Sequence, residues 1–215
     1  MRIVITGTAS GIGEAIAAKF LNEGHEVYGF DILESRIDHP RYRHFMHDLK
    51  ESEFPEIPEP EILINNAGTF KEADAIDVNL KGTIRFTEHF MGSPALKSVL
   101  FIASASARNG AEFPYYVASK AGLVGYMKKL ALDLSKHGVT VNSISPGGVI
   151  TASNIHILQS EKLYDAVKAE TLLGKWAEPE EIAELAYYMT IINRSMTGED
   201  LLVDNGEILK SNFIW

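Results

Sequence analysis

Cysteine is absent from this chain of 215 residues, and the absence removes several kinds of chemistry at once. Without a thiol there is no disulfide, no thiolate nucleophile and no cysteine-ligated zinc or iron–sulfur site. Seven histidines remain, but none stands in a His-Glu-x-x-His motif. The closest pair, His44 and His47, would point to opposite faces of a strand. We therefore expect no metal site, and any catalysis must use other side chains.

Long hydrophobic runs and basic clusters are also missing. No apolar stretch approaches the roughly 20 residues that a membrane-spanning helix needs. The first residues form a strand-like segment, which leaves no room for a signal peptide, so a cytoplasmic location is the default expectation. The formal net charge is −9 and no Lys/Arg cluster offsets it, so the surface should repel nucleic acid. These absences exclude membranes and nucleic acid as expected partners.

A regular alternation of strand and helix patterns is present instead. Residues 2–6 and 26–31 have the pattern of short strands around a helix at 11–23, which Gly24 would end. Further β-rich apolar runs, mostly separated by helical patterns, lie at 43–46, 61–65, 98–103, 139–145 and 200–203. This alternation predicts a single α/β domain, residues 1–215, built on a doubly wound parallel sheet of about seven strands.

The connection at residues 50–61 departs from this pattern. It carries Pro55, Pro58 and Pro60, and it cannot form a regular helix because proline removes amide donors. A parallel crossover normally needs a dozen or more residues and usually contains a helix. We expect residues 50–64 to cross as an irregular strap that leaves part of one sheet face thinly covered.

The helix predicted at residues 116–134 is apolar around most of its circumference. One apolar stripe would suffice for a surface helix. One face could meet the sheet and another a second subunit, although a cover from elsewhere in the same chain is the alternative. We predict a homodimer or homotetramer that assembles through this helix.

A glycine-rich segment joins the first strand to the first helix. Its glycines have the spacing Gly-x-x-x-Gly-x-Gly, which permits a tight turn where backbone amides meet a helix N-terminus. An anionic diphosphate would bind there, although a merely structural turn is the alternative. The residues assigned to this loop are Gly7, Ser10, Gly11, Ile12 and Gly13.

The end of the second strand indicates which dinucleotide would bind. Asp31 can accept hydrogen bonds from the adenosine ribose hydroxyls and would repel a 2′-phosphate. Ser10, before Gly11, supplies no basic side chain for an extra phosphate. NAD is therefore the predicted cofactor, unless Asp31 is an ordinary turn residue.

Two tyrosine–lysine pairs have the four-residue spacing that places both side chains on one helical face, Tyr116 with Lys120 and Tyr164 with Lys168. Tyr116 follows a strand and a small-residue loop containing Ser104, whereas the second pair lies in a polar stretch typical of a solvated face. A phenol with a pKa of ~10 needs about 4 kcal/mol to titrate near neutral pH, and a lysine at about 4 Å could supply that. We therefore expect Lys120 to lower the pKa of Tyr116.

The order of these motifs along nearly the whole chain resembles the short-chain dehydrogenase/reductase family, whose fold is Rossmann-like. The matching residues are the loop at 6–13, Asn65-Asn66-Ala67-Gly68, Asn79, Ser104, Tyr116 with Lys120, and Pro146-Gly147. The resemblance implies that Tyr116 exchanges the substrate proton, Ser104 steadies the substrate oxygen, Lys120 binds the nicotinamide ribose and Asn79 supports a proton relay. It also implies cofactor contacts from Tyr116 and Lys120 themselves and from Asp48, Leu49, Asn66, Ala67, Gly68, Pro146, Gly147, Val149 and Thr151.

The catalytic hydroxyl and the substrate are less closely defined. The family's serine usually lies one residue further upstream, where this chain has Ala103. We prefer Ser104 because it directly follows the strand, with Ser106 as the competing hydroxyl. Residues 152–174 show no charged clamp that would identify the substrate. The predicted activity is NAD-dependent interconversion of a secondary alcohol and a ketone.

Two other functions compete with this activity. A non-catalytic dinucleotide sensor would keep the glycine loop and Asp31 but would not need Tyr116 and Lys120. A nucleotide-sugar epimerase or dehydratase is disfavoured because no substrate domain follows Val203.

Overall fold

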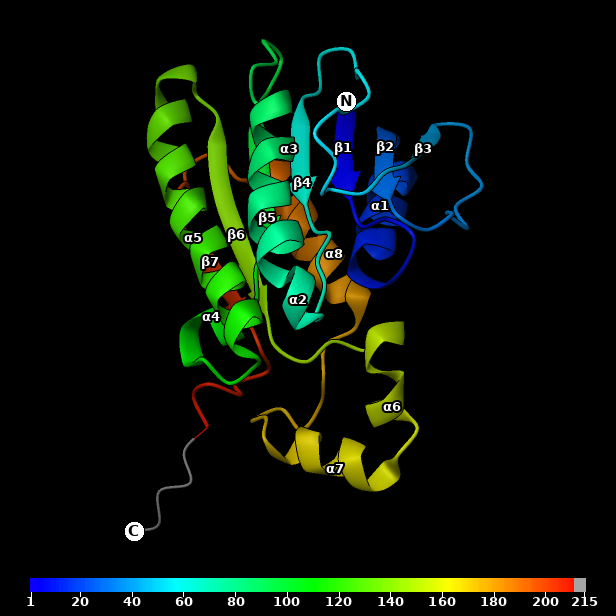
Figure 1. The fold of residues 1–215 in the computed structure, drawn as a ribbon, viewed down its shortest axis with the longest axis vertical. Helices are drawn as coiled ribbons and strands as arrows, with labels where there is room; N and C mark the ends of the chain where they lie inside the picture. The colour runs from blue at the N-terminus through cyan, green and yellow to red at the C-terminus, as the bar shows by residue number, and fades with distance from the viewer. Residues whose placement is uncertain (211–215) are drawn as a thin grey trace.

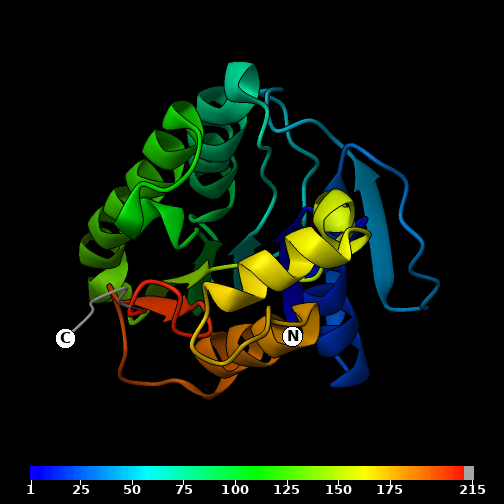
Figure 2. The ribbon, with the colours of Figure 1, turned by 90° about the horizontal axis from the view of Figure 1, so that it is seen from below.

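The computed structural model describes residues 1–210 and shows a parallel sheet between two layers of helices (Figures 1 and 2). The strand order is β3-β2-β1-β4-β5-β6-β7, and all neighbouring strands are parallel. The strand order reverses at the boundary between β1 and β4, as in a doubly wound, Rossmann-like sheet. The predicted fold class is confirmed. The strands are β1 (Arg2–Thr6), β2 (Glu26–Asp31), β3 (Tyr42–Met46), β4 (Ile62–Asn65), β5 (Ser98–Ile102), β6 (Thr140–Pro146) and β7 (Asp200–Val203).

Helices cover both faces of this sheet. α3 and α5 lie on one face, and α1 and α8 lie on the other (Figure 2). Within residues 1–210, no helix has the length and apolar character needed to cross a membrane. The helices are α1 (Gly11–Asn22), α2 (Glu72–Ala75), α3 (Thr83–Phe90), α4 (Ser106–Asn109), α5 (Pro114–Leu134), α6 (Ile155–Leu158), α7 (Glu161–Ala169) and α8 (Pro179–Tyr187), with π-helical η1 (Ile76–Gly82) and η4 (Tyr188–Ile192) and 3-10 turns η2 (Ser135–His137) and η3 (Ala152–Asn154).

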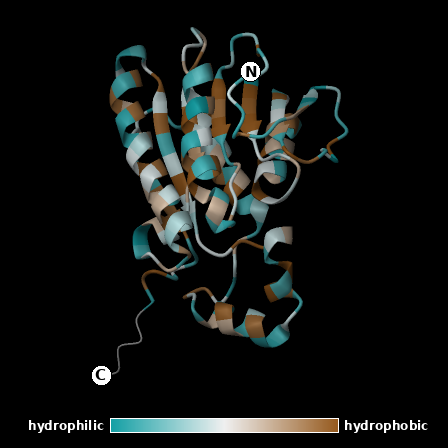
Figure 3. Cartoon of the chain, in the orientation of Figure 1, coloured by the Kyte–Doolittle hydropathy of each residue, from teal (hydrophilic) through white to brown (hydrophobic). Residues whose placement is uncertain are grey.

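Alternating strand residues build a hydrophobic core on each face of the sheet. Ile3 and Ile5 of β1 pack in one core with Phe20 of α1, whereas Val4 between them packs in the other core with Met127 of α5. The two cores follow from the period of two along a strand. Because both faces are covered, the central strands are hydrophobic along most of their length, whereas the helices carry both hydrophobic and hydrophilic residues (Figure 3).

The strap between β3 and β4 contains no helix, as predicted. It covers its sheet face better than expected, because Ile57 is only 5% exposed and the Phe54 ring lies 5.2 Å from that of Phe86. Beneath this cover, Phe30 of β2 is 1% exposed. The thin cover that we predicted is wrong for β2; on this face only the edge strand β3 shows an exposed side chain, Arg43.

All seven strands end at the same edge of the sheet, the lower edge in Figure 1. α4 and the segment that carries α6 and α7 lie beyond this edge. In a doubly wound sheet, ligands bind outside the carboxyl ends of the strands at the point where the strand order reverses. Here that point lies between β1 and β4.

Candidate active site

The loop between β1 and α1 is built for close approach of backbone. Gly7 has a φ of +76°, and a Cβ there would lie 2.6 Å from Nδ2 of Asn66. A Cβ on Gly13 would collide with the carbonyl oxygen of Gly7. Ser10 is the N-cap residue of α1 but makes no side-chain capping bond, which leaves first-turn amides for an anion. The loop therefore fits the diphosphate of a dinucleotide, with Gly11 and Ile12 opening the helix.

Asp31 holds the adjoining loops in place at the end of β2. Its carboxylate accepts hydrogen bonds from the backbone N–H of Ala9 at 2.9 Å and of Leu33 at 3.0 Å. The side chain is partly exposed, so it can also meet a ligand. One carboxylate thus joins the phosphate loop to the segment after β2, at the position where a ribose would lie.

The residues after β4 lock onto the end of β1. Asn66 donates from Nδ2 to the carbonyl oxygens of Thr6 and Gly7, at 3.1 Å each. The backbone N–H of Ala67 donates to Oγ1 of Thr6 at 3.0 Å. A Cβ on Gly68 would lie 3.4 Å from Nζ of Lys120, so this segment connects the phosphate loop to the candidate catalytic residues.

Tyr116 lies near the start of α5 and is only 6% exposed. Its ring stacks on that of Phe70, with 4.6 Å between the centroids, and the Ser104 hydroxyl lies close enough to its phenol to lower the phenol pKa. Oγ of Ser106 donates to Oγ of Ser104 at 2.8 Å, so the Ser104 hydroxyl proton is free to face the phenol. The structure thus places Ser104 against Tyr116 and Ser106 behind Ser104.

Burial changes the acidity of both central groups. It raises the pKa of Tyr116 to about 12, and the nearby Ser104 hydroxyl only partly opposes this effect. Burial also lowers the pKa of Lys120 to about 8. Lys120 is not among the groups that shift the pKa of Tyr116 here, so its expected lowering of that pKa, together with a bound oxidised nicotinamide, stays a prediction. Nζ of Lys120 lies 5.8 Å from the Tyr116 ring centroid and donates instead to the Ile102 carbonyl at 2.9 Å.

Asn79 belongs to the π-helical stretch η1 and is fully buried. Its Oδ1 accepts from the backbone N–H of Thr69 at 2.7 Å, and its Nδ2 donates to the Thr69 carbonyl at 3.0 Å. Nδ2 also donates to Oγ of Ser119, which donates to the Tyr116 carbonyl at 2.7 Å. The Asn79 side chain therefore holds the start of α5 in register with the segment after β4. Ser119 was missed from the sequence, although it lies within the Tyr116–Lys120 motif.

The end of β6 also lies at the carboxyl edge of the sheet, and it is hydrogen-bonded to its neighbours there. The Pro146 carbonyl accepts from Ala105, and the Gly147 N–H donates to Val203 at 2.9 Å. Val149 is buried and pairs with Ala177.

Thr151 lies against the glycine loop, because a Cβ on Gly11 would come within 3.2 Å of its Cγ2. Of the residues predicted from the Pro-Gly motif, Thr151 therefore lies beside the phosphate loop, and Pro146 lies beside Ala105, the residue after Ser104. Asp48 and Leu49 lie in the turn after β3, the edge strand that β2 separates from β1.

The competing pair, Tyr164 and Lys168, lies on α7. The Lys168 ammonium sits 4.6 Å from the Tyr164 ring centroid and pairs with Asp165 at 2.8 Å. Tyr164 meets Trp176 edge-on. This pair belongs to a partly solvated helix face, where its side chains contact Asp165 and Trp176.

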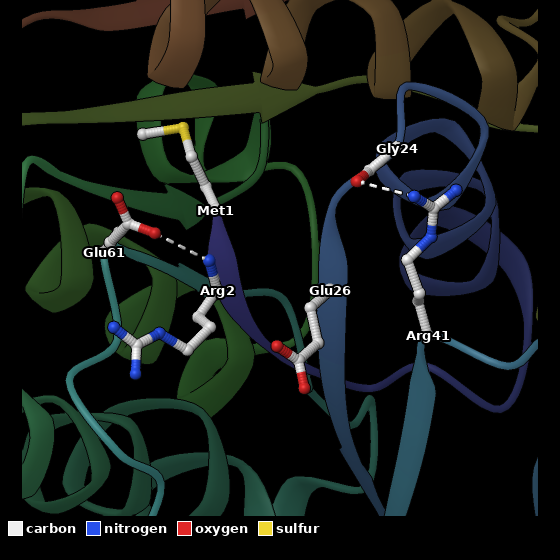
Figure 4. A pocket seen from close by; sticks show the side chains of 6 residues that line it. All are labelled: Met1, Arg2, Gly24, Glu26, Arg41 and Glu61. Carbon is white, nitrogen blue, oxygen red and sulfur yellow. Dashed lines mark hydrogen bonds between the residues drawn. The ribbon is translucent and has the colours of Figure 1, made fainter.

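Other features do not offer a competing site. In the described part of the chain, no group of three or more His, Asp or Glu side chains could hold a metal ion. An open pocket lined by Met1, Arg2, Gly24, Glu26, Arg41 and Glu61 lies where β1 and β2 begin (Figure 4). It is therefore at the opposite edge of the sheet from Tyr116.

Comparisons with known proteins agree with this geometry. A family model described as enoyl-(acyl carrier protein) reductase matches residues 60–207. The chain is 30% identical to D-threitol dehydrogenase of Mycolicibacterium smegmatis over 96% of this chain and 92% of that protein. It is 26% identical to L-rhamnose 1-dehydrogenase (NADP(+)) of Thermoplasma acidophilum over 96% of this chain and 95% of that protein.

A solved structure gives the same result. The structure of 4-hydroxyisoleucine dehydrogenase complexed with NADH has a TM-score of 0.86 to this chain at 28% identity, covering 98% of this chain and 99% of that one. The chain belongs to the short-chain dehydrogenase/reductase family. It is thus an oxidoreductase with an NAD(P)-binding Rossmann fold.

Proposed function

We propose that this protein is an NAD-dependent dehydrogenase that interconverts a secondary alcohol and a ketone. The observation that supports this most directly is that Tyr116, Ser104 and Lys120 converge beside the segment after β4 that is hydrogen-bonded to the glycine loop. Nicotinamide, when bound, supplies the hydride chemistry. The chain supplies position and proton transfer.

Tyr116 is the proposed general acid and base. With a pKa of about 12 it holds its proton at neutral pH, so it is ready to donate that proton to a carbonyl oxygen during reduction. In the oxidative direction the phenol first passes its own proton to water, and the phenolate then takes the proton of the alcohol hydroxyl. Ser104, supported by Ser106, is the proposed donor that steadies the substrate oxygen. Lys120 is the proposed contact for the nicotinamide ribose. Asn79 is proposed to support a proton relay, and its side chain holds the start of α5 against the segment after β4.

NAD is the proposed cofactor because Asp31 stands where a ribose would lie. The relatives differ on this point, since the rhamnose enzyme is named as NADP(+)-dependent whereas the 4-hydroxyisoleucine enzyme was solved with NADH. A buried or half-buried carboxylate repels a 2′-phosphate. Titration of the wild-type protein should therefore show NADH binding at least tenfold more tightly than NADPH. Tighter binding of NADPH would refute the assignment.

A secondary alcohol or ketone is the proposed small-molecule substrate, and a second copy of the chain is the proposed partner. The exposed face of α5 supports assembly, because Leu132 is 75% exposed there. A cytoplasmic location stays a prediction.

Replacing Tyr116 by Phe tests the proposed mechanism. Tyr116→Phe should retain NADH binding, because the diphosphate and adenosine contacts proposed for the glycine loop and Asp31 do not involve the phenol hydroxyl. Turnover should fall at least a thousandfold on the substrates that a screen of alcohols and ketones identifies with the wild-type protein, since the proton carrier is gone. The matched control is Tyr164→Phe on α7, which should leave turnover within twofold. Undiminished turnover of Tyr116→Phe would refute the mechanism. NADH binding without turnover by the wild type would favour a dinucleotide sensor.

A further inference from the structure

Arg85 of α3 reaches across to the turn that follows β3. Its Nη2 donates to the carbonyl oxygen of Leu49 at 2.8 Å and to that of Lys50 at 3.3 Å. Gly82, three residues earlier, packs against the same turn, where a Cβ would lie 2.8 Å from the Leu49 carbonyl oxygen. Leu49 itself is buried, so its carbonyl needs a donor from the protein.

The missing crossover helix explains why a side chain from α3 is needed here. In a helix that began after β3, the carbonyls of its first residues would accept bonds from amides four residues later. Residues 47–61 form no helix. The turn has a bond from Glu51 N–H to the Asp48 carbonyl at 2.9 Å and one from Lys50 N–H to the Asp48 carboxylate at 2.9 Å, and neither satisfies the carbonyl of Leu49 or Lys50. The Arg85 guanidinium, with donors in a rigid fork, replaces the absent helical bonds.

The turn lies at the adenosine end of the proposed cofactor site. β3 pairs with β2 so that Met46 lies opposite Asp31, and the turn begins two residues further along. The end of β4, with Asn66, lies on the other side of β1. Asp48 and Leu49 therefore stand at the strand ends next to the residue proposed to hold the ribose.

We propose that Arg85 is a positioning residue for the adenine of the dinucleotide: by holding the carbonyls of Leu49 and Lys50, it sets the position of Asp48 and Leu49 against the ring. The inference rests on the proposed cofactor site, but it does not depend on the redox mechanism. Arg85 does not touch the reacting atoms and should influence adenosine binding alone.

The test compares Arg85→Met with Lys81→Met by calorimetric titration of ADP-ribose. Both changes remove one positive charge from the same run of helix, and the Lys81 side chain is 60% exposed with only an Asp77 partner. Arg85→Met should raise the Kd for ADP-ribose about tenfold, since it removes two hydrogen bonds from a charged donor, whereas Lys81→Met should change it less than twofold. Arg85→Lys, which keeps the charge and one donor, should recover part of the affinity.

A second readout separates positioning from general stability. With the substrate identified by the screen, the KM for NAD should rise about tenfold in Arg85→Met while kcat at saturating NAD stays within twofold. An unchanged Kd for ADP-ribose in folded Arg85→Met, or in Arg85→Lys if the former does not fold, would overturn the inference. Loss of kcat together with an unchanged KM would overturn it as well. Absence of ADP-ribose and NADH binding in the wild type would instead refute the proposed function.

Discussion

Burial acts in opposite directions on the two ionisable groups at the centre of the site. The neutral phenol of Tyr116 is favoured, and the charged ammonium of Lys120 is disfavoured, because neither charge is hydrated. Lys120 keeps one hydrogen bond, to the Ile102 carbonyl. The residues needed for chemistry are thus held at a cost in stability, as is common at functional sites.

Replacing Lys120 by Met tests how much the buried charge lowers the free energy of unfolding. The pKa of Lys120 falls from 10.5 to about 8 on folding, so below pH 8 the burial penalty is fully present, and it is relieved as the pH rises from 8 to 10.5. The free energy of unfolding should therefore be about 2 kcal/mol higher in the variant at pH 7, and the gap should shrink toward pH 10. Urea unfolding at both pH values checks this. The exposed Lys81→Met should differ from wild type by less than about 0.5 kcal/mol, and a less stable Lys120→Met at pH 7 would contradict the prediction.

At the scale of elements, the strap between β3 and β4 replaces a helix with two apolar anchors. Ile57 is buried among residues of the α3 and α5 face, and Phe54 packs edge-on against Phe86 at 5.2 Å. Its prolines prevent a helix but do not prevent these contacts. The strap is therefore part of the hydrophobic core.

Phe54→Ala tests whether the strap stabilises the fold. Removing a half-buried aromatic ring from a packed cluster should lower the free energy of unfolding by about 2 kcal/mol, measured by urea denaturation. Glu53→Ala is the matched control because this side chain is exposed one residue earlier, and it should change stability by less than about 0.5 kcal/mol. Equal stabilities of the two variants would show that the strap only lies on the surface.

At the scale of the whole molecule, α5 connects the candidate site to the surface proposed for assembly. Tyr116 and Lys120 lie near its beginning, and Leu123, Met127 and Leu130 anchor it on the sheet. Its outer face carries Gly125, where an added Cβ would meet nothing within 4 Å. A large side chain is therefore compatible with the single chain and incompatible with a closely packed second copy.

Gly125→Arg tests the predicted homodimer or homotetramer. Sedimentation velocity should show that the wild type is an oligomer and that the variant dissociates to a smaller species, because the arginine occupies the space of the partner helix. Gly92→Arg is the control, since Gly92 is also exposed with open space around its Cβ but lies outside α5. A monomeric wild type, or a Gly125→Arg variant of unchanged size, would argue against assembly through α5.

Local patterns were sufficient to predict the sheet and the motifs. All seven strands lie within one residue of their predicted ends, because apolar runs bounded by turn residues are legible in the chain itself. The glycine loop, Asp31, and Tyr116 with Lys120 were identified by spacing and by their place at strand ends. The preference for Ser104 over Ser106 also came from its position directly after a strand.

Only the tertiary structure decided how these residues act on one another. Three contacts in particular could not be predicted from spacing in the sequence. They are the row of hydroxyls from Ser106 to Ser104 to Tyr116, the hydrogen bonds of Arg85 to the turn after β3, and the packing of Phe54 of the strap on Phe86. The raised pKa of Tyr116 likewise depends on burial, which the sequence alone does not measure. Periodicity along the chain determines which elements form, whereas desolvation and hydrogen bonding depend on distances between residues far apart in sequence. The sequence by itself therefore determined the fold class and predicted the members of the candidate site, and the packing of the folded chain decided their acidity and their support.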